Sequence, residues 1–231
     1  MSAGWLTFWD SSHSIYVNAR HRDVHYSLIA QQIAALVPSA QARVLDYGCG
    51  EALHADLVAA AAGALLLAEG APRVRAGIAA RFAGNAKIRA VAPEDVERMA
   101  DRSLDLIVLH SVAQYLTPEE LAKLFALFHR LLTADGVLVV SDVIPSDVAA
   151  STDALALLRF GTENGFLIAA VTGLVRTLLS DYWRLRTRYG LTRYGEAAMT
   201  GKLAAAGFFA QRATRNIGHN QARMAFMARP R

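Results

Sequence analysis

The residues of this chain that are best spaced to bind a charged organic ligand lie at 44–53, which read VLDYGCGEAL. A carboxylate, Asp46, precedes a turn that contains Gly48 and Gly50. Glycine lets the backbone approach a ligand closely, because no Cβ intervenes. The unpaired N–H groups at the start of a following helix favour an anionic group, whereas Asp46 could bind a cationic one. The stretch therefore predicts a site for a ligand that carries both an ammonium and a carboxylate.

A second acidic residue, Glu69, directly follows the apolar run of residues 64–68. A carboxylate at a strand end can accept hydrogen bonds from both hydroxyls of a ribose, although it could also be an ordinary surface glutamate. A dinucleotide is a weaker alternative. Its G-x-G-x-x-G fingerprint needs a small residue where this chain has Leu53, and Asp46 would repel a pyrophosphate. The pair of acids favours a nucleoside-like ligand with a cationic amino group.

The elements that must position these residues follow from alternating apolar and helix-length patterns. We expect strands at about 43–46, 64–68, 87–91, 104–109 and 136–142, and helices at about 52–61, 73–82, 94–99 and 118–132. Thr117 before Pro118 is a good N-cap for the last of these helices. Short apolar strands separated by helices predict a parallel sheet covered on both faces. Two late strands, joined by a short turn around 218–220, predict an antiparallel hairpin that ends the sheet.

With these elements in place, residues 44–53 resemble the first motif of class I S-adenosylmethionine-dependent methyltransferases, [VIL]-L-D-x-G-C-G-x-G, and the resemblance extends over about 43–145. Residues 110–116, HSVAQYL, lack the N/D-P-P-Y/F motif of base and amide methylation and look closer to the small-molecule branch. Ala52 stands where this family often has glycine, and we expect a modest effect.

The resemblance implies an α/β fold, a Rossmann-like three-layer sandwich with a seven-stranded, mostly parallel sheet, and S-adenosyl-L-methionine as cofactor. It divides the chain into a helical lid (1–40), a cofactor-binding core (41–149), a helical cap inserted after the fifth strand (150–192), and a C-terminal helix and hairpin (193–231). The residues expected to contact the cofactor are Asp46, Tyr47, Gly48, Cys49, Gly50, Glu69, Gly70, Glu94, Asp95, His110 and Ser111.

Within that set, the acids after the third strand have two interpretations. The family often has an acid where this chain has Ala92, so Glu94 or Asp95 could bind the adenine amino group instead. Equally, both could be acids in the first turn of a short helix. Cys49 is interpreted as a small buried residue, because no histidine partner is evident from the sequence.

Methyl transfer from a sulfonium requires alignment of acceptor and methyl group and, for a hydroxyl acceptor, removal of a proton. His110, at the end of the fourth predicted strand, is the first candidate base, and Tyr16 and Tyr115 could orient the acceptor. The other candidate bases are His13, His21, His25 and His219. We expect no metal, because the histidine spacing offers one i,i+4 pair without a nearby cysteine or ordered set of acids.

Composition constrains the remaining possibilities. The 231 residues are 54% hydrophobic and 19% charged, which suits a substantial core. A single cysteine fits a reducing compartment, and neither a secretory signal nor a spanning apolar run is present, so a cytoplasmic location is expected. The basic pI of about 9.5 raises an RNA methyltransferase as an alternative. The lack of the base-methylation motif argues against nucleic acid, and a non-catalytic cofactor-binding protein stays open as another alternative.

The expected acceptor is a small or lipid-like molecule, methylated on oxygen, nitrogen or carbon. Residues 176–188 alternate leucines and aromatics with arginines, so the part of the cap at 160–188 could contact a membrane interface or a second copy of the chain. It could also be a cap that simply packs on the core. The chain is expected to be a monomer or a homodimer.

Overall fold

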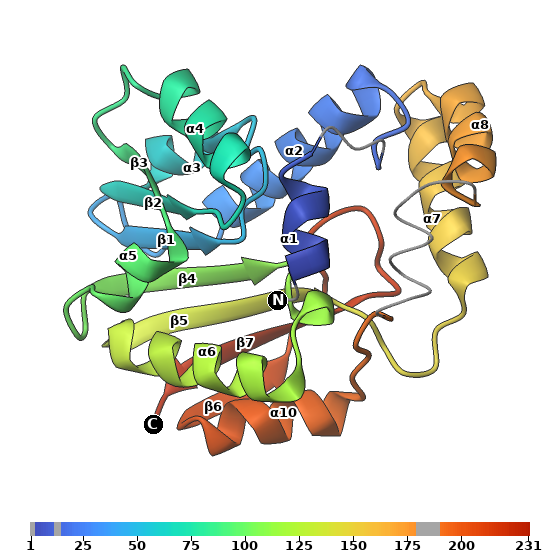
Figure 1. Ribbon diagram of the computed structural model, residues 1–231. Helices are drawn as coiled ribbons and strands as arrows, with labels where there is room; N and C mark the ends of the chain where they lie inside the picture. The colour runs from blue at the N-terminus through green and yellow to red at the C-terminus, as the bar shows by residue number, and fades with distance from the viewer. Residues whose placement is uncertain (1–2, 12–14, 179–189) are drawn as a thin grey trace.

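A computed structural model describes residues 3–11, 15–178 and 190–231 and forms one seven-stranded sheet (Figure 1). The strand order is β3-β2-β1-β4-β5-β7-β6. Strands β1 to β5 are mutually parallel, and β7 is antiparallel to both of its neighbours, β5 and β6. The strands are β1 (Arg43–Tyr47), β2 (Ala64–Ala68), β3 (Ile88–Val91), β4 (Leu104–His110), β5 (Leu132–Val143), β6 (Phe208–Arg212) and β7 (Met224–Pro230). The predicted fold class is confirmed.

The helices form a layer on each face of the sheet, because successive strand residues alternate between two hydrophobic cores. Val44 and Val108 face a core shared with α2 (Ala19–Ala34), α3 (Ala55–Ala61) and α4 (Pro72–Arg81). Leu45 and Leu109 face the opposite core, which is shared with α5 (Pro93–Glu97), α6 (Pro118–Leu131) and α10 (Glu196–Ala205). All four strand residues are completely buried, so both faces of the sheet are covered.

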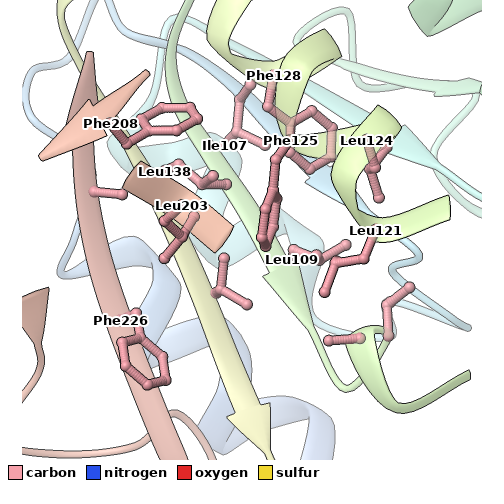
Figure 2. Close-up of a cluster of buried hydrophobic side chains, with 14 of the residues drawn as sticks. Ile107, Leu109, Leu121, Leu124, Phe125, Phe128, Leu138, Leu203, Phe208 and Phe226 are labelled. Atoms are coloured by element: carbon pink, nitrogen blue, oxygen red, sulfur yellow. The ribbon is translucent and has the colours of Figure 1, made fainter. Parts of the chain in front are cut away.

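Figure 2 shows the second core, where one side of α6 packs onto β4 and β5. Phe125 and Phe128 are fully buried there, and Phe208 and Phe226 close the core from the antiparallel strands. The helix begins as the sequence predicts. Thr117 Oγ1 accepts the Glu120 N–H at 3.2 Å, and the Glu120 carboxylate accepts the Thr117 N–H at 2.9 Å.

Removal of this cap should lower the stability of the protein. Thr117→Ala is expected to lower the free energy of unfolding by about 1 kcal/mol, because the N–H of Glu120 loses its acceptor. Urea titration followed by circular dichroism measures the change. Thr200→Ala is the matched control, since Thr200 lies inside α10 and its hydroxyl only donates back to the carbonyl of Glu196. An equal loss in both variants would contradict a capping role.

Three boundaries differ from the sequence predictions. Strand β5 begins at Leu132, four residues earlier than expected, and α3 begins at Ala55 rather than 52. The late helix start has a local cause, because Ala52 has a left-handed backbone (φ 45°) that cannot continue a helix. The predicted short hairpin turn is wrong. Residues 213–223 connect β6 to β7.

The longer connection is held by its own polar side chains. The Gln221 carboxamide accepts the Asn216 N–H at 3.0 Å and donates to the carbonyls of Asn216 and Gly218. Asn216 in turn donates to the carbonyl of Asn220. Because these bonds replace a strand ladder, the segment folds as a structured loop rather than a tight turn.

The remaining helices gather near the carboxyl ends of the parallel strands (Figure 1). They are α1 (Ala3–Trp9), α7 (Ala150–Glu163), α8 (Leu167–Leu178) and a short 3₁₀ helix after β4 (Ala113–Tyr115). Phe160, Phe166 and Ala170 join α7 and α8, and they pack against Val24 and Leu28 of α2. Within the described ranges, no helix is long and apolar enough to cross a membrane.

Candidate active site

A cavity of about 900 Å³ lies at the carboxyl ends of the parallel strands, between the sheet and helices α1, α2 and α7. Strand ends supply four of its titratable groups, namely Asp46 from β1, Glu69 after β2, His110 from β4 and Asp142 from β5. The volume is large enough for a nucleoside and a second small molecule. The predicted cofactor and catalytic residues that line this cavity are Tyr16, Asp46, Tyr47, Gly48, Cys49, Gly50, Glu69, Gly70, Glu94, His110, Ser111 and Tyr115.

The glycine turn after β1 has no room for side chains. Gly48 has φ 75°, and a Cβ on it would lie 2.4 Å from Val112 Cγ2. Gly50 has φ 58°, and its Cβ would lie 2.7 Å from the hydroxyl oxygen of Tyr26. Ala52 also has a positive φ of 45°, a conformation that costs about 1 kcal/mol more for alanine than for glycine. The turn is therefore strained at Ala52, the residue at which the sequence departs from the family pattern.

Glu69 fastens this turn to the end of β2. Its Oε2 accepts the Gly50 N–H at 3.0 Å, and its Oε1 accepts the Ala71 N–H at 2.8 Å. Burial raises the pKa of the Glu69 carboxyl, and these backbone bonds oppose that effect. Each carboxylate oxygen has a second lone pair, so a rigidly held Glu69 can still accept two hydroxyl donors from a ligand.

Asp46 lies beside Glu69, because β1 and β2 are neighbours in register. Burial, together with the nearby Glu69 carboxylate, raises the pKa of Asp46 to about 7. Near neutral pH the side chain is therefore divided between its acid and carboxylate forms. A cation bound next to it would favour the carboxylate form, so that binding releases the carboxyl proton.

Tyr26 of α2 is a site residue that the sequence analysis missed. Its hydroxyl oxygen accepts the Glu51 N–H at 2.9 Å, which fixes the glycine turn from the side opposite the sheet. Burial raises the pKa of Tyr26 well above the usual value for tyrosine, so the side chain stays neutral. No local pattern marks Tyr26, because its partner lies 25 residues further along the chain.

Ser111 and Asp142, at the ends of β4 and β5, are linked directly. The Ser111 hydroxyl donates to Asp142 Oδ2 at 2.5 Å, and the Asp142 N–H donates to Asn216 Oδ1 at 2.8 Å. Both residues have left-handed backbones, φ 57° and 58°, which are strained for non-glycine residues. Asp142 was not among the predicted site residues, although its place at the end of a predicted parallel strand was a usable signal.

His110 is held by two serine hydroxyls. Its Nδ1 lies 3.0 Å from Ser141 Oγ, and its Nε2 lies 3.2 Å from Ser111 Oγ. Burial lowers the pKa of His110, and the Asp142 carboxylate opposes that shift. The side chain is therefore a neutral, oriented wall of the cavity.

The two candidate tyrosines lie in different aromatic clusters. The Tyr115 ring contacts Trp5 and Trp9 of α1, with ring centroids 4.7 Å and 5.5 Å away. Tyr16 precedes α2 and contacts His21 and Tyr26, at 5.6 Å and 5.7 Å. Burial raises the pKa of Tyr16, so its hydroxyl also stays protonated.

The acids after β3 have separate positions. Glu94 lines the cavity, whereas Asp95 does not. The Asp95 carboxylate accepts the Ala92 N–H at 3.0 Å and pairs with Arg98 at 3.3 Å, on the exposed side of α5. Asp95 therefore acts as a helix cap here, and Glu94 is the acid in place to contact a ligand.

Four further histidines line the cavity, namely His21, His25, His54 and His219. His13 and most of the arginine-rich segment, residues 179–189, lie outside the described residues. In the part of the chain that is described, no group of three or more histidine, cysteine or acidic side chains is arranged to hold a metal ion.

Comparison with known proteins agrees with this geometry. Residues 45–140 match a family described as a methyltransferase domain. No curated protein matches the sequence. The fold is similar to the N-methyltransferase NodS from Bradyrhizobium japonicum WM9 in complex with S-adenosyl-l-homocysteine. The two chains share 15% identity over 98% of this chain and 96% of that one, with a TM-score of 0.58.

Two other solved structures have a similar fold. Magnesium protoporphyrin IX methyltransferase (ChlM) from Synechocystis PCC 6803, with bound SAH, shares 16% identity over 99% of this chain and 93% of that one, with a TM-score of 0.61. The other is a complex between the Haloferax volcanii Trm112 methyltransferase activator and the putative methyltransferase. The match shares 12% identity over 90% of this chain and 91% of that one, with a TM-score of 0.58. The match of residues 45–140 to a methyltransferase domain and the shared fold both agree with the predicted resemblance to class I S-adenosylmethionine-dependent methyltransferases.

Proposed function

We propose that this protein transfers a methyl group from S-adenosyl-L-methionine to a small or lipid-like acceptor. The observation that carries the proposal is the pair of carboxylates, Asp46 and Glu69, at the ends of adjacent strands beside a glycine turn that excludes side chains. A ligand with an ammonium and a ribose matches this pair of acids. The binding of S-adenosylhomocysteine by NodS supports the same assignment.

The residues present fit this cofactor. Asp46 would bind its ammonium group, Glu69 its ribose hydroxyls, and Glu94 is in place to meet its adenine. When bound, the cofactor supplies a methyl group on a positively charged sulfur. The protein's task is then to hold an acceptor in line with that group and to keep water out.

The other half of the cavity suits the acceptor. It is lined by Tyr16, His110, Leu157 and His219, from segments on several sides of the cavity. Aromatic and apolar walls with a few polar groups are typical of sites for small molecules. This composition supports a small or lipid-like acceptor held between the sheet and the helices α2 and α7.

The outer side of α8 supports contact with an apolar surface. Ile168 is 83% exposed, and Val171 and Val175 are also exposed, which is unusual for aliphatic residues on one helix face. We therefore keep the expectation that residues 160–188 contact a membrane interface or a second copy of the chain.

Calorimetric titration tests the cofactor. The purified protein should bind S-adenosylmethionine and S-adenosylhomocysteine with micromolar dissociation constants and should not bind NAD. Glu69→Gln should weaken both about tenfold, since hydrogen bonds to a charged acceptor contribute about 1.5–3 kcal/mol. Glu163→Gln, an exposed change on α7 outside the cavity, is the control. Absence of binding by either sulfur nucleoside would refute the proposal.

Loss of one hydroxyl on α2 should also weaken the cofactor. Tyr26→Phe removes the acceptor of the Glu51 N–H, so the glycine turn loosens and the dissociation constant should rise about fivefold to tenfold, equivalent to roughly 1 kcal/mol. The same calorimetric titration measures it. Tyr194→Phe is the matched control, because within the described chain the buried Tyr194 hydroxyl has no hydrogen-bond partner. Equal affinities for the two variants would show that Tyr26 does not order the turn.

A further inference from the structure

We propose that His219 accepts the proton of a hydroxyl-bearing acceptor, so that the protein methylates oxygen on a phenol or an enol. The inference rests on the proposed function, because it assumes a methyl donor in the other half of the cavity. Five imidazoles line this cavity, those of His21, His25, His54, His110 and His219. His54 directly follows the glycine turn, in the half proposed for the cofactor, and its Nε2 is paired with Asp23 Oδ1 at 2.8 Å. A base needs a free ring nitrogen and neighbours that tolerate the positive charge it acquires.

His110 lacks the free nitrogen. The Ser111 hydroxyl donates its hydrogen to Asp142, so it can only accept a hydrogen bond from His110 Nε2. Nε2 therefore carries the ring hydrogen of His110. His110 Nδ1 then accepts a hydrogen bond from Ser141 Oγ, a residue that is completely buried. Both ring nitrogens are occupied, and His110 orients the site rather than taking a proton.

His21 and His25 are unsuitable for different reasons. His21 Nδ1 accepts the Val17 N–H at 3.3 Å, and its ring stacks on Phe166 with a centroid distance of 5.0 Å. Its lone pair is therefore already used. The His25 ring lies 6.0 Å from that of His21 and 6.2 Å from that of His219. A proton on His25 would be buried among other imidazoles, and both the burial and these imidazoles disfavour its charge.

His219 meets both requirements. Neither of its ring nitrogens has a hydrogen bond to any residue that the structure describes, and the side chain is half-buried on the cavity wall. Its ring stacks on Phe160, with centroids 4.4 Å apart and planes 11° apart, which fixes its orientation. Two carboxylates, those of Asp142 and Asp153, favour the imidazolium form.

The electrostatic surroundings of His219 keep it neutral until it reacts. Burial lowers the pKa of His219, and Asp142 and Asp153 oppose this shift. Asp153 is fixed by Arg223, with Nη2 and Oδ2 2.7 Å apart. The charged and titratable groups that face His219 from the surrounding elements are His21, His25, His110, Asp142, Asp153 and Arg223. A neutral imidazole with two carboxylates nearby can take up a proton during the reaction.

The step balances with one base. A lone pair of the hydroxyl oxygen forms the bond to the methyl carbon, and the carbon–sulfur bond breaks with its electron pair going to sulfur. The hydroxyl proton moves to His219, which later releases it to water. The products are a methyl ether, S-adenosylhomocysteine and one proton. Because a weak base removes a proton efficiently only from an acidified hydroxyl, a phenol or enol is the matching acceptor, and Tyr16 offers it an aromatic wall.

The test compares hydroxyl and amine acceptors. The protein is given S-adenosylmethionine with catechol or 1-naphthol, and in parallel with 1,2-diaminobenzene or 1-naphthylamine. Mass spectrometry follows S-adenosylhomocysteine and the methylated product. The variants are His219→Gln and His219→Asn. His129→Gln is the matched control, since His129 lies on α6 against Phe208 and outside the cavity.

We expect the hydroxyl acceptors to be methylated, and kcat to fall at least about 100-fold in both His219 variants while the cofactor dissociation constant changes less than about twofold. In the wild type, kcat should fall as pH drops below the pKa of His219, and this acid limb should be absent from the variants. Methylation of amines alone, of no member of the panel, or of hydroxyls at nearly the wild-type rate in both variants would each overturn the inference. Failure to bind S-adenosylmethionine would instead overturn the proposed function, and this inference with it.

Discussion

Asp46→Asn should abolish tight cofactor binding and at the same time make the ligand-free protein more stable. The ammonium group loses an ionic partner, and hydrogen bonds of that kind contribute about 1.5–3 kcal/mol, so the dissociation constant for S-adenosylmethionine should rise roughly 100-fold. Calorimetric titration measures this. Asp56→Asn, an exposed change in the first turn of α3, is the control and should leave affinity unchanged.

The stability gain follows from the raised pKa of Asp46. The folded carboxyl titrates near 7 and the unfolded one near 3.8, so the folded protein binds more protons between about pH 4 and 7. Raising the pH through this window therefore destabilises the wild type relative to the asparagine variant. The full shift would correspond to about 4 kcal/mol. Water in the cavity screens part of it, and we expect about 1–2 kcal/mol at pH 8 and almost none at pH 4. Thermal melts at pH 8 and pH 4 measure the difference. Equal melting temperatures of the wild type and the asparagine variant at both pH values would contradict the raised pKa of Asp46.

The same titration makes wild-type binding depend on pH. With a pKa of about 7, the ionised fraction of Asp46 falls about fivefold between pH 7 and pH 6, and the affinity for S-adenosylmethionine should fall with it. Binding should also release a proton, which appears as a dependence of the measured heat on the ionisation enthalpy of the buffer. The asparagine variant should show neither effect.

Gly48→Ala should have the second largest effect. The new Cβ would lie 2.4 Å from Val112 Cγ2, and alanine at φ 75° is strained by about 1–2 kcal/mol. Relief of the contact must move either the turn or Val112, which is buried after β4. We expect a loss of about 2–4 kcal/mol in the free energy of unfolding and at least a 100-fold loss of cofactor affinity.

Gly77→Ala provides the matched control. Gly77 lies within α4, and a Cβ there would meet no atom within 4 Å. Alanine is the better helix former, so this variant should gain about 0.5–1 kcal/mol in stability and bind the cofactor normally. Denaturant titration and calorimetry on both glycine variants separate the effect of a tight turn from that of adding a methyl group. Normal binding by Gly48→Ala would show that the turn does not need glycine.

The sequence alone determined the sheet and the residues that line the half of the cavity that we propose for the cofactor. Asp46, Gly48, Gly50 and Glu69 are placed by local structure, since each lies on a strand end or in the turn that follows it. Apolar alternation and helical periodicity are also local, and they predicted the strand–helix order and the core side of α6. These local patterns predict the folded structure because a strand buries one face through every second residue and a helix through residues three or four apart.

The tertiary structure decided the rest. Tyr26 bonds to the Glu51 N–H of the glycine turn, 25 residues away in the sequence, and Ser111 bonds to Asp142, 31 residues away. His219 was one of several candidate bases in the sequence, and only the folded chain stacks it on Phe160 of α7 and places it near two aspartates from different elements. That segment was expected to be a tight turn, but it is a loop held by Asn216 and Gln221. Such contacts depend on how distant elements pack, and the choice among the five cavity histidines depends on hydrogen bonds that form only when the chain is folded.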